Sequence, residues 1–388
     1  MRELRDYLQA MKDQKASDLL IITGSPVSCK QGKEVRPVFT DEGKIMPDRA
    51  KELVDEIYHY TRPKRTQDHL HTARDDDFAF GIDDLARFRV NVYYQRGSLA
   101  AVIRIVPNRI PDYHTIGIKN YIINSVVESP NPNGDPEDDR VSKLKSGLIL
   151  ITGTAGSGKS TTQACMVDYI NRTRSAHVVT LEDPVEYTHR NQMGIVSQRE
   201  IGIDVIDYPH GLRSCLREAP DVILIGEMRD AETIKAAITA AETGHLVIAT
   251  LHTESAVSSV NRIIDSFPGS QQDQIRSQLS YVLRTVISQQ LVRTGASSFV
   301  PAFEVMHVNT AIGNCIRGND PNGMDRTINE GQDGMISMAR FLEDLEEGND
   351  SVASAPAGTA SSEPASSRLP VPPVEPPAKQ SGWPFRKR

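Results

Sequence analysis

The sequence has few cysteines, and they are not arranged as a metal or disulfide motif would require. Its 388 residues include four, Cys29, Cys165, Cys215 and Cys315, and no C-x-x-C pair. This spacing excludes a zinc ribbon and provides no framework of disulfides. We therefore expect reduced thiols and a cytosolic protein.

Long apolar runs are also missing. Nowhere do eighteen apolar residues follow one another, and the charged start Met1–Asp6 leads into no apolar segment. Both a signal peptide and a membrane-spanning helix need such a run. We expect neither, so any contact with a membrane has to be peripheral.

Basic residues are not in excess. The chain has 44 Lys and Arg against 51 Asp and Glu, which gives a formal net charge of −7. A protein that coats nucleic acid carries the opposite balance, because its partner is a polyanion. The composition therefore argues against nucleic acid as a partner.

The first 106 residues show the pattern of a small α+β domain. Apolar residues recur at helical spacing over residues 3–15 and again near 48–60. Short strands are expected at Leu19–Ile22, Val35–Phe39, Phe78–Ile82, Phe88–Tyr94 and Ala100–Val106. Short strands with two helices predict one domain over residues 1–106.

The next segments differ in composition. Residues 107–143 combine a proline-flanked hinge with a proline-rich acidic insertion near 130–140, which is expected to be an exposed loop. Residues 144–310 alternate strands with helices, which indicates a parallel sheet covered by helices. Short helices are expected over residues 311–348.

The end of the chain has a composition of its own. Ala, Ser and Pro dominate residues 349–388, which cannot form a core and are expected to be disordered. The last residues, Trp383–Arg388, are aromatic and basic. They are either a solvated end or a peptide that inserts at a membrane surface or in a partner's groove.

A glycine-rich loop follows the first strand of the second domain. The apolar run Leu148–Thr152 stops in Gly153–Ser160, which matches G-x-x-x-x-G-K-[ST] in the strand-loop-helix context of a P-loop. Backbone N–H groups of such a loop surround a phosphate, and the following helix adds its positive end. The residues expected to bind ATP are Gly153, Thr154, Ala155, Gly156, Ser157, Gly158, Lys159, Ser160 and Thr161. Lys159 would reach the β- and γ-phosphates, and Ser160 would hold Mg²⁺.

Four apolar runs of this domain end in polar clusters. They are Leu148–Thr152, Val178–Leu181, Val222–Ile225 and Leu246–Thr250. They lead, in this order, into the P-loop, Glu182, Glu227 and His252. Since ligands of open α/β sheets bind at the carboxyl ends of the strands, we expect all four clusters around the same phosphates.

Strand direction separates two pairs of candidates. Asp221 and Glu227 flank one strand, about 20 Å apart at about 3.3 Å per residue, so only Glu227 can lie on the nucleotide side. His245 and His252 flank another strand and cannot ligate one metal ion together. We favour His252 as the phosphate sensor. His245 either contributes to the site or has a helix-end or packing role.

Two glutamates suit the two tasks of ATP hydrolysis. One carboxylate has to secure Mg²⁺ through water, and the other has to polarise the attacking water. We assign Glu227 to the metal and Glu182 to the water. The reverse assignment is the alternative.

Together these clusters resemble one family, the PilT/PilU-type twitching-motility ATPases of the secretion ATPase superfamily. The resemblance is carried by an Asp box, a Walker B segment, a His box and two further motifs. They are Thr180–Tyr187, Gly226–Asp230, Ala241–Thr253, Gln198–Glu200 and Arg87–Asn91. The resemblance covers residues 1 to about 345, apart from the acidic insertion.

The resemblance implies a PAS-like N-terminal domain, a RecA-like ATPase domain and a hexameric ring. It also implies ATP-driven retraction of type IV pili through an inner-membrane platform protein, and so an indirect action on pilin. In this family, arginines of the N-terminal domain reach the nucleotide, and the matching positions are Arg89 and Arg104. We expect them to act across the interface between subunits.

Two departures from the family bear on its branches. The tetracysteine metal site of extension and type II secretion ATPases is absent, which favours retraction. The family's retraction motif A-I-R-N-L-I-R-E is matched only by Ala311–Gly318, which has Gly313 in place of its first arginine and Gly318 in place of its final glutamate. Primary PilT-like and accessory PilU-like motors both stay open, as do a regulatory nucleotide-binding subunit and an extension or secretion ATPase.

Overall fold

The computed structural model describes residues 2–32, 34–62, 64–106, 109–119, 122–123, 144–294 and 299–347. The acidic insertion near 130–140 and the tail expected over 349–388 lie outside these residues. The domain boundaries given above stay predictions.

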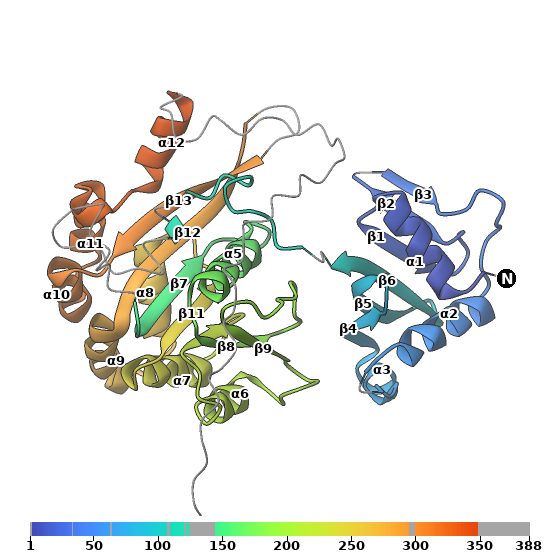
Figure 1. Ribbon diagram of the computed structural model, residues 1–388, viewed down its shortest axis with the longest axis horizontal. Coiled ribbons are helices and arrows are strands. Elements are labelled where there is room, and N and C mark those ends of the chain that lie inside the picture. Colours follow the sequence, from blue (N-terminus) through green and yellow to red (C-terminus); the bar gives the residue numbers. More distant parts are fainter. Residues whose placement is uncertain are drawn as a thin grey trace, which may run out of the picture. The chain divides into compact units, whose positions relative to one another are not determined.

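The N-terminal part of the described chain forms a six-stranded antiparallel sheet in the order β3-β2-β1-β6-β5-β4 (Figure 1). Its strands are β1 (Asp18–Ile22), β2 (Ser28–Gln31), β3 (Glu34–Pro37), β4 (Asp75–Ile82), β5 (Ala86–Gln95) and β6 (Ser98–Val106). Its helices are α1 (Leu4–Asp13), α2 (Pro47–His59) and α3 (Asp68–Ala73). The short elements β2 and α3 were not predicted, because so few residues show no clear period.

One face of this sheet is buried against α1 and α2. Phe88 and Val90 of β5 belong to this core, whereas Arg89 between them is only half-buried. Successive side chains of a strand point to opposite faces, so Arg89 lies on the face away from the helices. Arg104 of β6 is the direct cross-strand partner of Arg89 and shares that face.

The second sheet has seven strands among the described residues, in the order β13-β12-β7-β11-β10-β8-β9. All neighbouring strands are parallel except β13, which runs antiparallel to β12 at one edge. The strands are β7 (Gly147–Thr152), β8 (His177–Glu182), β9 (Ile195–Glu200), β10 (Val222–Ile225), β11 (Leu246–Leu251), β12 (Leu283–Arg293) and β13 (Phe299–His307).

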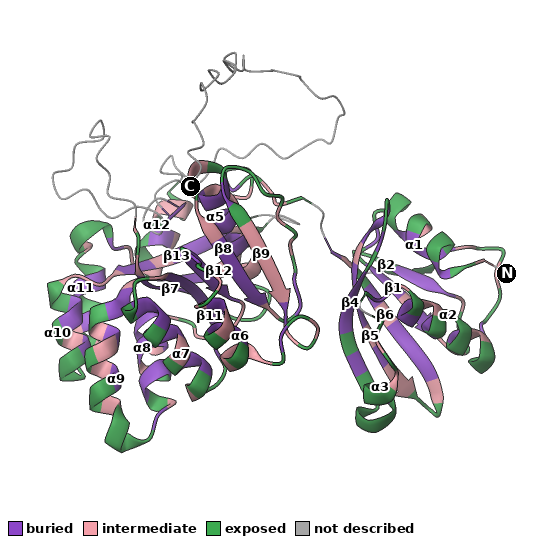
Figure 2. Cartoon of the chain, turned by 60° about the horizontal axis from the view of Figure 1, so that its bottom comes forward, coloured by how far each residue is buried: buried purple, intermediate pink, exposed green. Residues whose placement is uncertain are grey.

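Helices cover both faces of the parallel sheet. They are α5 (Lys159–Thr173), α6 (Tyr208–Cys215), α7 (Ala231–Glu242), α8 (Ala256–Asp265) and α9 (Gly269–Val282). Leu148 and Leu150 of β7 pack in a core with α6 to α9, whereas Ile149 and Ile151 pack in a second core with α5. Strands buried on both faces explain the continuous apolar runs of the sequence, and they appear purple in Figure 2. The expected fold class, with a small α+β part before a helix-covered parallel sheet, is confirmed.

Short helices follow the second sheet, as predicted. They are α10 (Thr310–Gly318), α11 (Pro321–Asn329), the 3₁₀ turn η1 (Gln332–Gly334) and α12 (Met338–Glu346). Phe341 of α12 packs edge-on against Phe303 of β13, which attaches the last described helix to the sheet. No helix among the described residues is long and apolar enough to cross a membrane.

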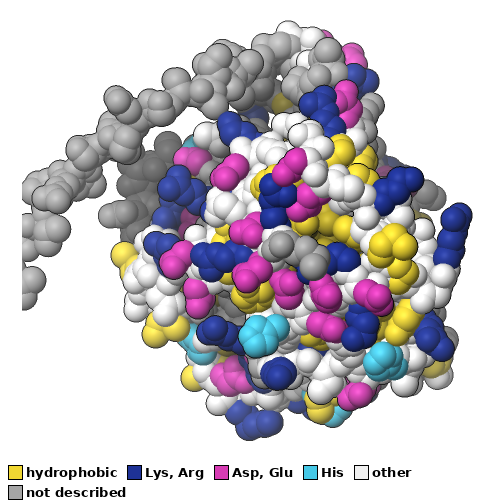
Figure 3. All heavy atoms as spheres, turned by 90° about the vertical axis from the view of Figure 1, so that its right-hand side faces the viewer, with side chains coloured by type: hydrophobic (Ala, Val, Ile, Leu, Met, Phe, Trp, Pro, Cys, Tyr) yellow, Lys and Arg dark blue, Asp and Glu magenta, His cyan; other side chains and the backbone are white. Residues whose placement is uncertain are grey.

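The face drawn in Figure 3 interleaves cations and anions rather than gathering one sign. Pairs in the N-terminal part include Arg2 with Asp41 at 2.9 Å and Lys51 with Asp55 at 3.2 Å. Exposed pairs of this kind contribute roughly 0–1 kcal/mol each. The stability of this part therefore depends more on its apolar core and on buried polar groups, among them a cluster around Asp76.

Asp76 of β4 forms that cluster. Its carboxylate is 1% exposed and accepts hydrogen bonds from Tyr58 Oη at 2.8 Å, Arg65 Nε at 2.9 Å and Arg65 Nη2 at 2.6 Å. Burial and this carboxylate both raise the pKa of Tyr58, so the phenol stays protonated as a donor. The cluster connects α2 and the segment before α3 to the edge strand β4.

We predict that Asp76→Asn destabilises the N-terminal part by roughly 2–4 kcal/mol. Removing one member of a buried pair leaves the other charge without compensation, although the partial exposure of Arg65 lowers that cost. Asp83→Asn is the matched control, because Asp83 directly follows the same strand, is 87% exposed and faces Arg62 only at 3.8 Å. Urea unfolding of the full chain measures both variants. Equal midpoints would contradict the role given to Asp76.

Candidate functional site

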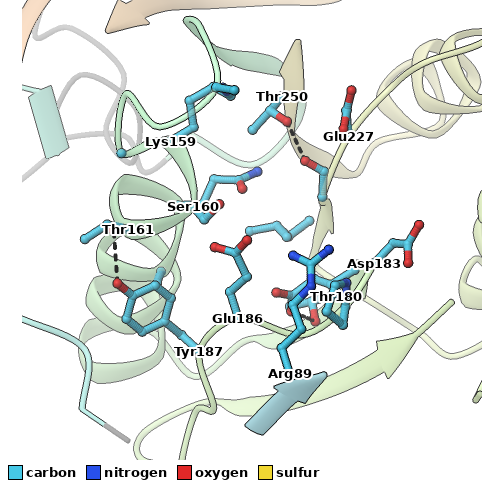
Figure 4. A pocket seen from close by; sticks show the side chains of 18 of the residues that line it. Arg89, Lys159, Ser160, Thr161, Thr180, Asp183, Glu186, Tyr187, Glu227 and Thr250 are labelled. Carbon is cyan, nitrogen blue, oxygen red and sulfur yellow. Dashed lines mark hydrogen bonds between the residues drawn. The ribbon is translucent and has the colours of Figure 1, made fainter. Parts of the chain in front are cut away.

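The carboxyl ends of β7, β8, β10 and β11 meet at one cavity of about 470 Å³ (Figure 4). It is lined by residues from all four predicted clusters, including Lys159, Glu182, Glu227 and His252. The strand-direction argument also holds at the other end of the sheet. Asp221 and His245 line a separate cavity there.

His245 has a helix-end contact instead of a place at this cavity. Its Nδ1 donates to the carbonyl oxygen of Ala240 in the last turn of α7, at 3.1 Å. Of the two readings left open by the sequence, the structure supports the helix-end role.

Gly153 begins the P-loop with φ at 146°. A Cβ at this position would lie 2.2 Å from the backbone oxygen of Gln289 on β12. Because no side chain fits in that space, the backbone can leave β7 this close to β12 only at a glycine. The loop is thus fixed by the spacing of two strands as well as by its own sequence.

Gln289 also holds the P-loop through its side chain, which sequence reasoning missed. Its Nε2 donates to the carbonyl oxygen of Ser157 at 2.7 Å, and its Oε1 accepts from Thr162 Oγ1 at 2.7 Å. The residue is 4% exposed. The only signal in the sequence is a run of polar residues, 288–290, between the apolar pairs 286–287 and 291–292.

The loop presents groups that suit a phosphate. Lys159 Nζ donates to the carbonyl oxygens of Gly153 at 2.8 Å and Thr154 at 2.9 Å. The Ser157 hydroxyl is buried and has no hydrogen-bond partner among the described residues. The Lys159 ammonium group in a glycine-rich loop fits an anion with several acceptor oxygens, whereas Ser157 is not among the residues that line the cavity. The remaining predicted residues Ala155, Gly156, Gly158, Ser160 and Thr161 line the same cavity.

A chain of polar contacts connects the P-loop to the end of β10. Lys159 Nζ lies 3.2 Å from His252 Nδ1, and His252 Nε2 lies 3.3 Å from Glu227 Oε1. An ammonium group only donates, so Nδ1 of the ring accepts and Nε2 carries the proton toward Glu227. Arg229 Nη2 pairs with the other oxygen of Glu227 at 2.8 Å.

The electrostatics of Lys159 and Glu227 follow from these surroundings. Burial lowers the pKa of Lys159, although Glu227 and Glu186 oppose that effect. Burial opposes ionisation of Glu227, but Arg229 and His252 outweigh it and lower the pKa of this carboxyl. Glu227 is therefore held as a carboxylate.

Glu182 is in a different environment at the end of β8. Burial raises its pKa, although hydrogen bonds from Thr180 and Gln198 oppose the effect. Thr180 Oγ1 donates to Glu182 Oε1 at 2.7 Å. The cavity thus contains two glutamates whose pKa values are shifted in opposite directions.

Arg89 and Arg104 also line the cavity, and each is paired with a carboxylate of its own sheet. Arg89 binds Asp77 through two nitrogens, at 3.2 and 2.7 Å, and Arg104 Nε lies 2.7 Å from Asp18 Oδ1. Both guanidinium groups keep substantial exposure, 40% and 68% of the side chain. They therefore have donors left for a further anion.

The segment after Glu182 contributes two further residues to the cavity, which the sequence indicated only as part of a longer motif. Glu186 and Tyr187 line the cavity, and Tyr187 Oη lies 2.9 Å from Thr161 Oγ1, a contact dashed in Figure 4. The segment thereby reaches the first turn of α5. No local pattern of the sequence indicates that contact.

Both residues expected to hold Mg²⁺ lie at this cavity. The described residues contain no group of three or more His, Cys, Asp or Glu side chains that could hold a metal by themselves. Ser160 and Glu227 both line the cavity, and a hydroxyl with a carboxylate is the protein's usual share of a Mg²⁺ site completed by phosphates and water. The residues present fit that arrangement.

Comparisons with known proteins agree with this chemistry. The family model described as Type II/IV secretion system protein matches residues 128–365. The type IV pilus retraction ATPase PilT of Pseudomonas aeruginosa is 37% identical over 88% of this chain and 94% of its own length. The type IV pilus ATPase PilU of the same organism is 34% identical over 75% of this chain and 71% of its own length.

A solved structure extends the likeness to three dimensions. The crystal structure of the pilus retraction motor PilT with bound ADP superposes with a TM-score of 0.78. It is 37% identical and covers 89% of this chain and 94% of its own. The chain therefore belongs to the type II/IV secretion system protein family, among the relatives of the pilus retraction ATPase PilT.

Proposed function

We propose that the protein is an ATP-hydrolysing motor that retracts type IV pili as a ring of six copies. The observation that carries the proposal is the cavity where the P-loop, Glu182, Glu227 and His252 meet. The similarity to PilT and PilU supports the same reading. The motor would act in the cytoplasm, at the inner face of the membrane, on a platform protein that carries the pilus. It would be either a primary motor like PilT or an accessory motor like PilU, since the chain is similar to both proteins.

The proposed roles begin with binding. The P-loop from Gly153 to Thr161 would hold the phosphates of ATP, with Lys159 against the β- and γ-phosphates. Ser160 and Glu227 would hold Mg²⁺, which neutralises phosphate charge when bound. Support for Glu227 in this role is its lowered pKa, since a metal site needs a carboxylate that stays ionised.

Glu182 would take the proton from the attacking water. A general base works best when its pKa approaches the working pH, and burial raises the pKa of Glu182 in that direction. Arg89, Arg104 and His252 would stabilise the negative charge that develops on the transferred phosphoryl group. In the single chain Arg89 and Arg104 line the cavity of that same chain. In the ring, the corresponding arginines of the neighbouring subunit would take this place.

Phosphate release from ATP tests the proposed function as a whole. Purified protein should release phosphate from ATP in the presence of Mg²⁺, and Lys159→Ala should abolish this release because the charge facing the phosphates is lost. Deletion of the gene should leave surplus pili on the cell surface, counted by microscopy. An oligomer that binds ATP without releasing phosphate would instead indicate the regulatory subunit. Loss of surface pili on deletion would indicate an extension motor.

Glu182→Gln should keep the affinity for ATP within about twofold and lower kcat roughly 100-fold, the scale of a lost general base. In the unsubstituted protein, kcat should fall at low pH as Glu182 takes up a proton. That fall should occur at a pH above the range in which ordinary carboxyl groups titrate, because burial raises the pKa of Glu182. Glu227→Gln is the matched comparison and should raise the Mg²⁺ concentration needed for half-maximal rate. If the two variants exchange these effects, the assignment of the glutamates is reversed.

Mixed oligomers test the origin of the arginines. Subunits with Arg104→Ala and subunits with Lys159→Ala should be inactive alone, but in equal mixture they should recover up to roughly a quarter of the activity, because intact half-sites meet at a quarter of random interfaces. The control mixture pairs Lys159→Ala with Glu182→Gln. It should stay inactive, since both changes affect the same half-site. No recovery in mixed rings of proven composition would mean that Arg104 acts within its own chain or not at all.

A further inference from the structure

Gln198 of β9 contacts Glu182 and the segment that follows it. Its Nε2 donates to Glu182 Oε1 at 3.2 Å and to the carbonyl oxygen of Tyr187 at 2.7 Å. Its Oε1 accepts from the backbone N–H of His189 at 2.8 Å. The amide of Gln198 thus makes all three of these hydrogen bonds.

The orientation of this amide is fixed by its neighbours. Glu182 Oε1 and the Tyr187 carbonyl oxygen only accept hydrogen bonds, so the nitrogen of the amide has to face both. A flipped amide would place its oxygen against two acceptors and its nitrogen against the N–H of His189. The three hydrogen bonds therefore form in only one of the two orientations of the Gln198 amide.

Gln198 and Thr180 act on the same atom of Glu182. Thr180 Oγ1 donates to Oε1 from two residues earlier on β8, the strand of Glu182 itself, and Gln198 on the adjacent strand β9 is the register partner of Thr180. An ionised carboxylate offers about four acceptor positions, so lone pairs remain for a water molecule in the cavity. With Oε1 held from two strands, the carboxylate has one preferred plane.

The same amide also shapes the segment after Glu182. Its bonds to Tyr187 and His189 hold the backbone that carries Glu186 into the cavity. Tyr187 in turn reaches Thr161 beside the P-loop. One side chain thus joins the carboxylate at the end of β8 to the segment that contacts α5.

We propose that Gln198 is a positioning residue for ATP hydrolysis: it holds the Glu182 carboxylate in the orientation in which it takes a proton from water. The inference rests on the proposed function of Glu182. Gln198 is not among the residues that line the cavity, so its effect should appear in turnover rather than in binding.

The test uses Gln198→Met, which keeps the length of the side chain and removes its hydrogen bonds. We expect kcat to fall about tenfold, the scale of one lost hydrogen bond to a charged group, with ATP affinity unchanged within about twofold. The loss of that donor should also raise the pKa of Glu182 further. The fall of kcat at low pH should then begin at a higher pH than in the unsubstituted protein.

Two controls separate positioning from a general loss of structure. Ser197→Ala removes a hydrogen bond of the neighbouring residue on β9, from Ser197 Oγ to His177 Nε2 at 2.9 Å, and should change neither kcat nor its pH dependence. Adding Gln198→Met to Glu182→Gln should cost almost nothing more, because the group it positions is already gone.

These measurements distinguish a failure of the proposed function from a failure of the role given to Gln198. If the unsubstituted oligomer releases no phosphate, the proposed function fails. If it does, and Gln198→Met leaves kcat and its pH dependence unchanged, or lowers kcat equally in the Glu182→Gln background, the role given to Gln198 is wrong.

Discussion

The site depends on one constraint, the common direction of the strands β7, β8, β10 and β11. Parallel strands place all their carboxyl ends on one edge of the sheet, so four short polar segments far apart in the sequence meet there. The strands have to be buried on both faces for this arrangement to form, which is why each is an apolar run that ends abruptly. The chemistry of the site is then set by the polar residues that follow each apolar run. The same constraint keeps Asp221 and His245 away, although each flanks a strand that ends at the cavity.

Environment, rather than residue type, separates the two glutamates. Both follow buried strands and both line the cavity, yet Glu227 has a guanidinium and an imidazole beside it, whereas Glu182 has only neutral donors. The Arg229 cation and the N–H of His252 stabilise the ionised form of Glu227, and burial without a cation destabilises that of Glu182. A carboxylate that stays charged suits a metal ion, and one that takes up a proton more easily suits water. This division of roles stays a proposal, which the directions of the two pKa shifts support.

The sequence predicted those features that a local pattern encodes. The P-loop has a motif, and the four strands that lead into the cavity have apolar runs with clear ends, so their convergence followed from strand direction alone. The short strand β2 and helix α3 have too few residues for a period to show. Gln289 was missed for a different reason, because its contact with the P-loop depends on β12 lying beside β7. Such pairings join residues more than a hundred positions apart and leave no mark on the residues themselves.

Gln289 and Gln198 lie on opposite sides of the cavity and solve the same physical problem. Each joins a strand outside the four central ones to a loop of the site, and each uses both its donor and its acceptor. A lysine or a glutamate at either position would bring a charge that competes with the phosphates or with Glu182. An amide fixes the backbone without adding charge, so the charges in the cavity come from other residues, among them Lys159, the arginines and the glutamates. The precision of the site and its charge are thus provided by different residues.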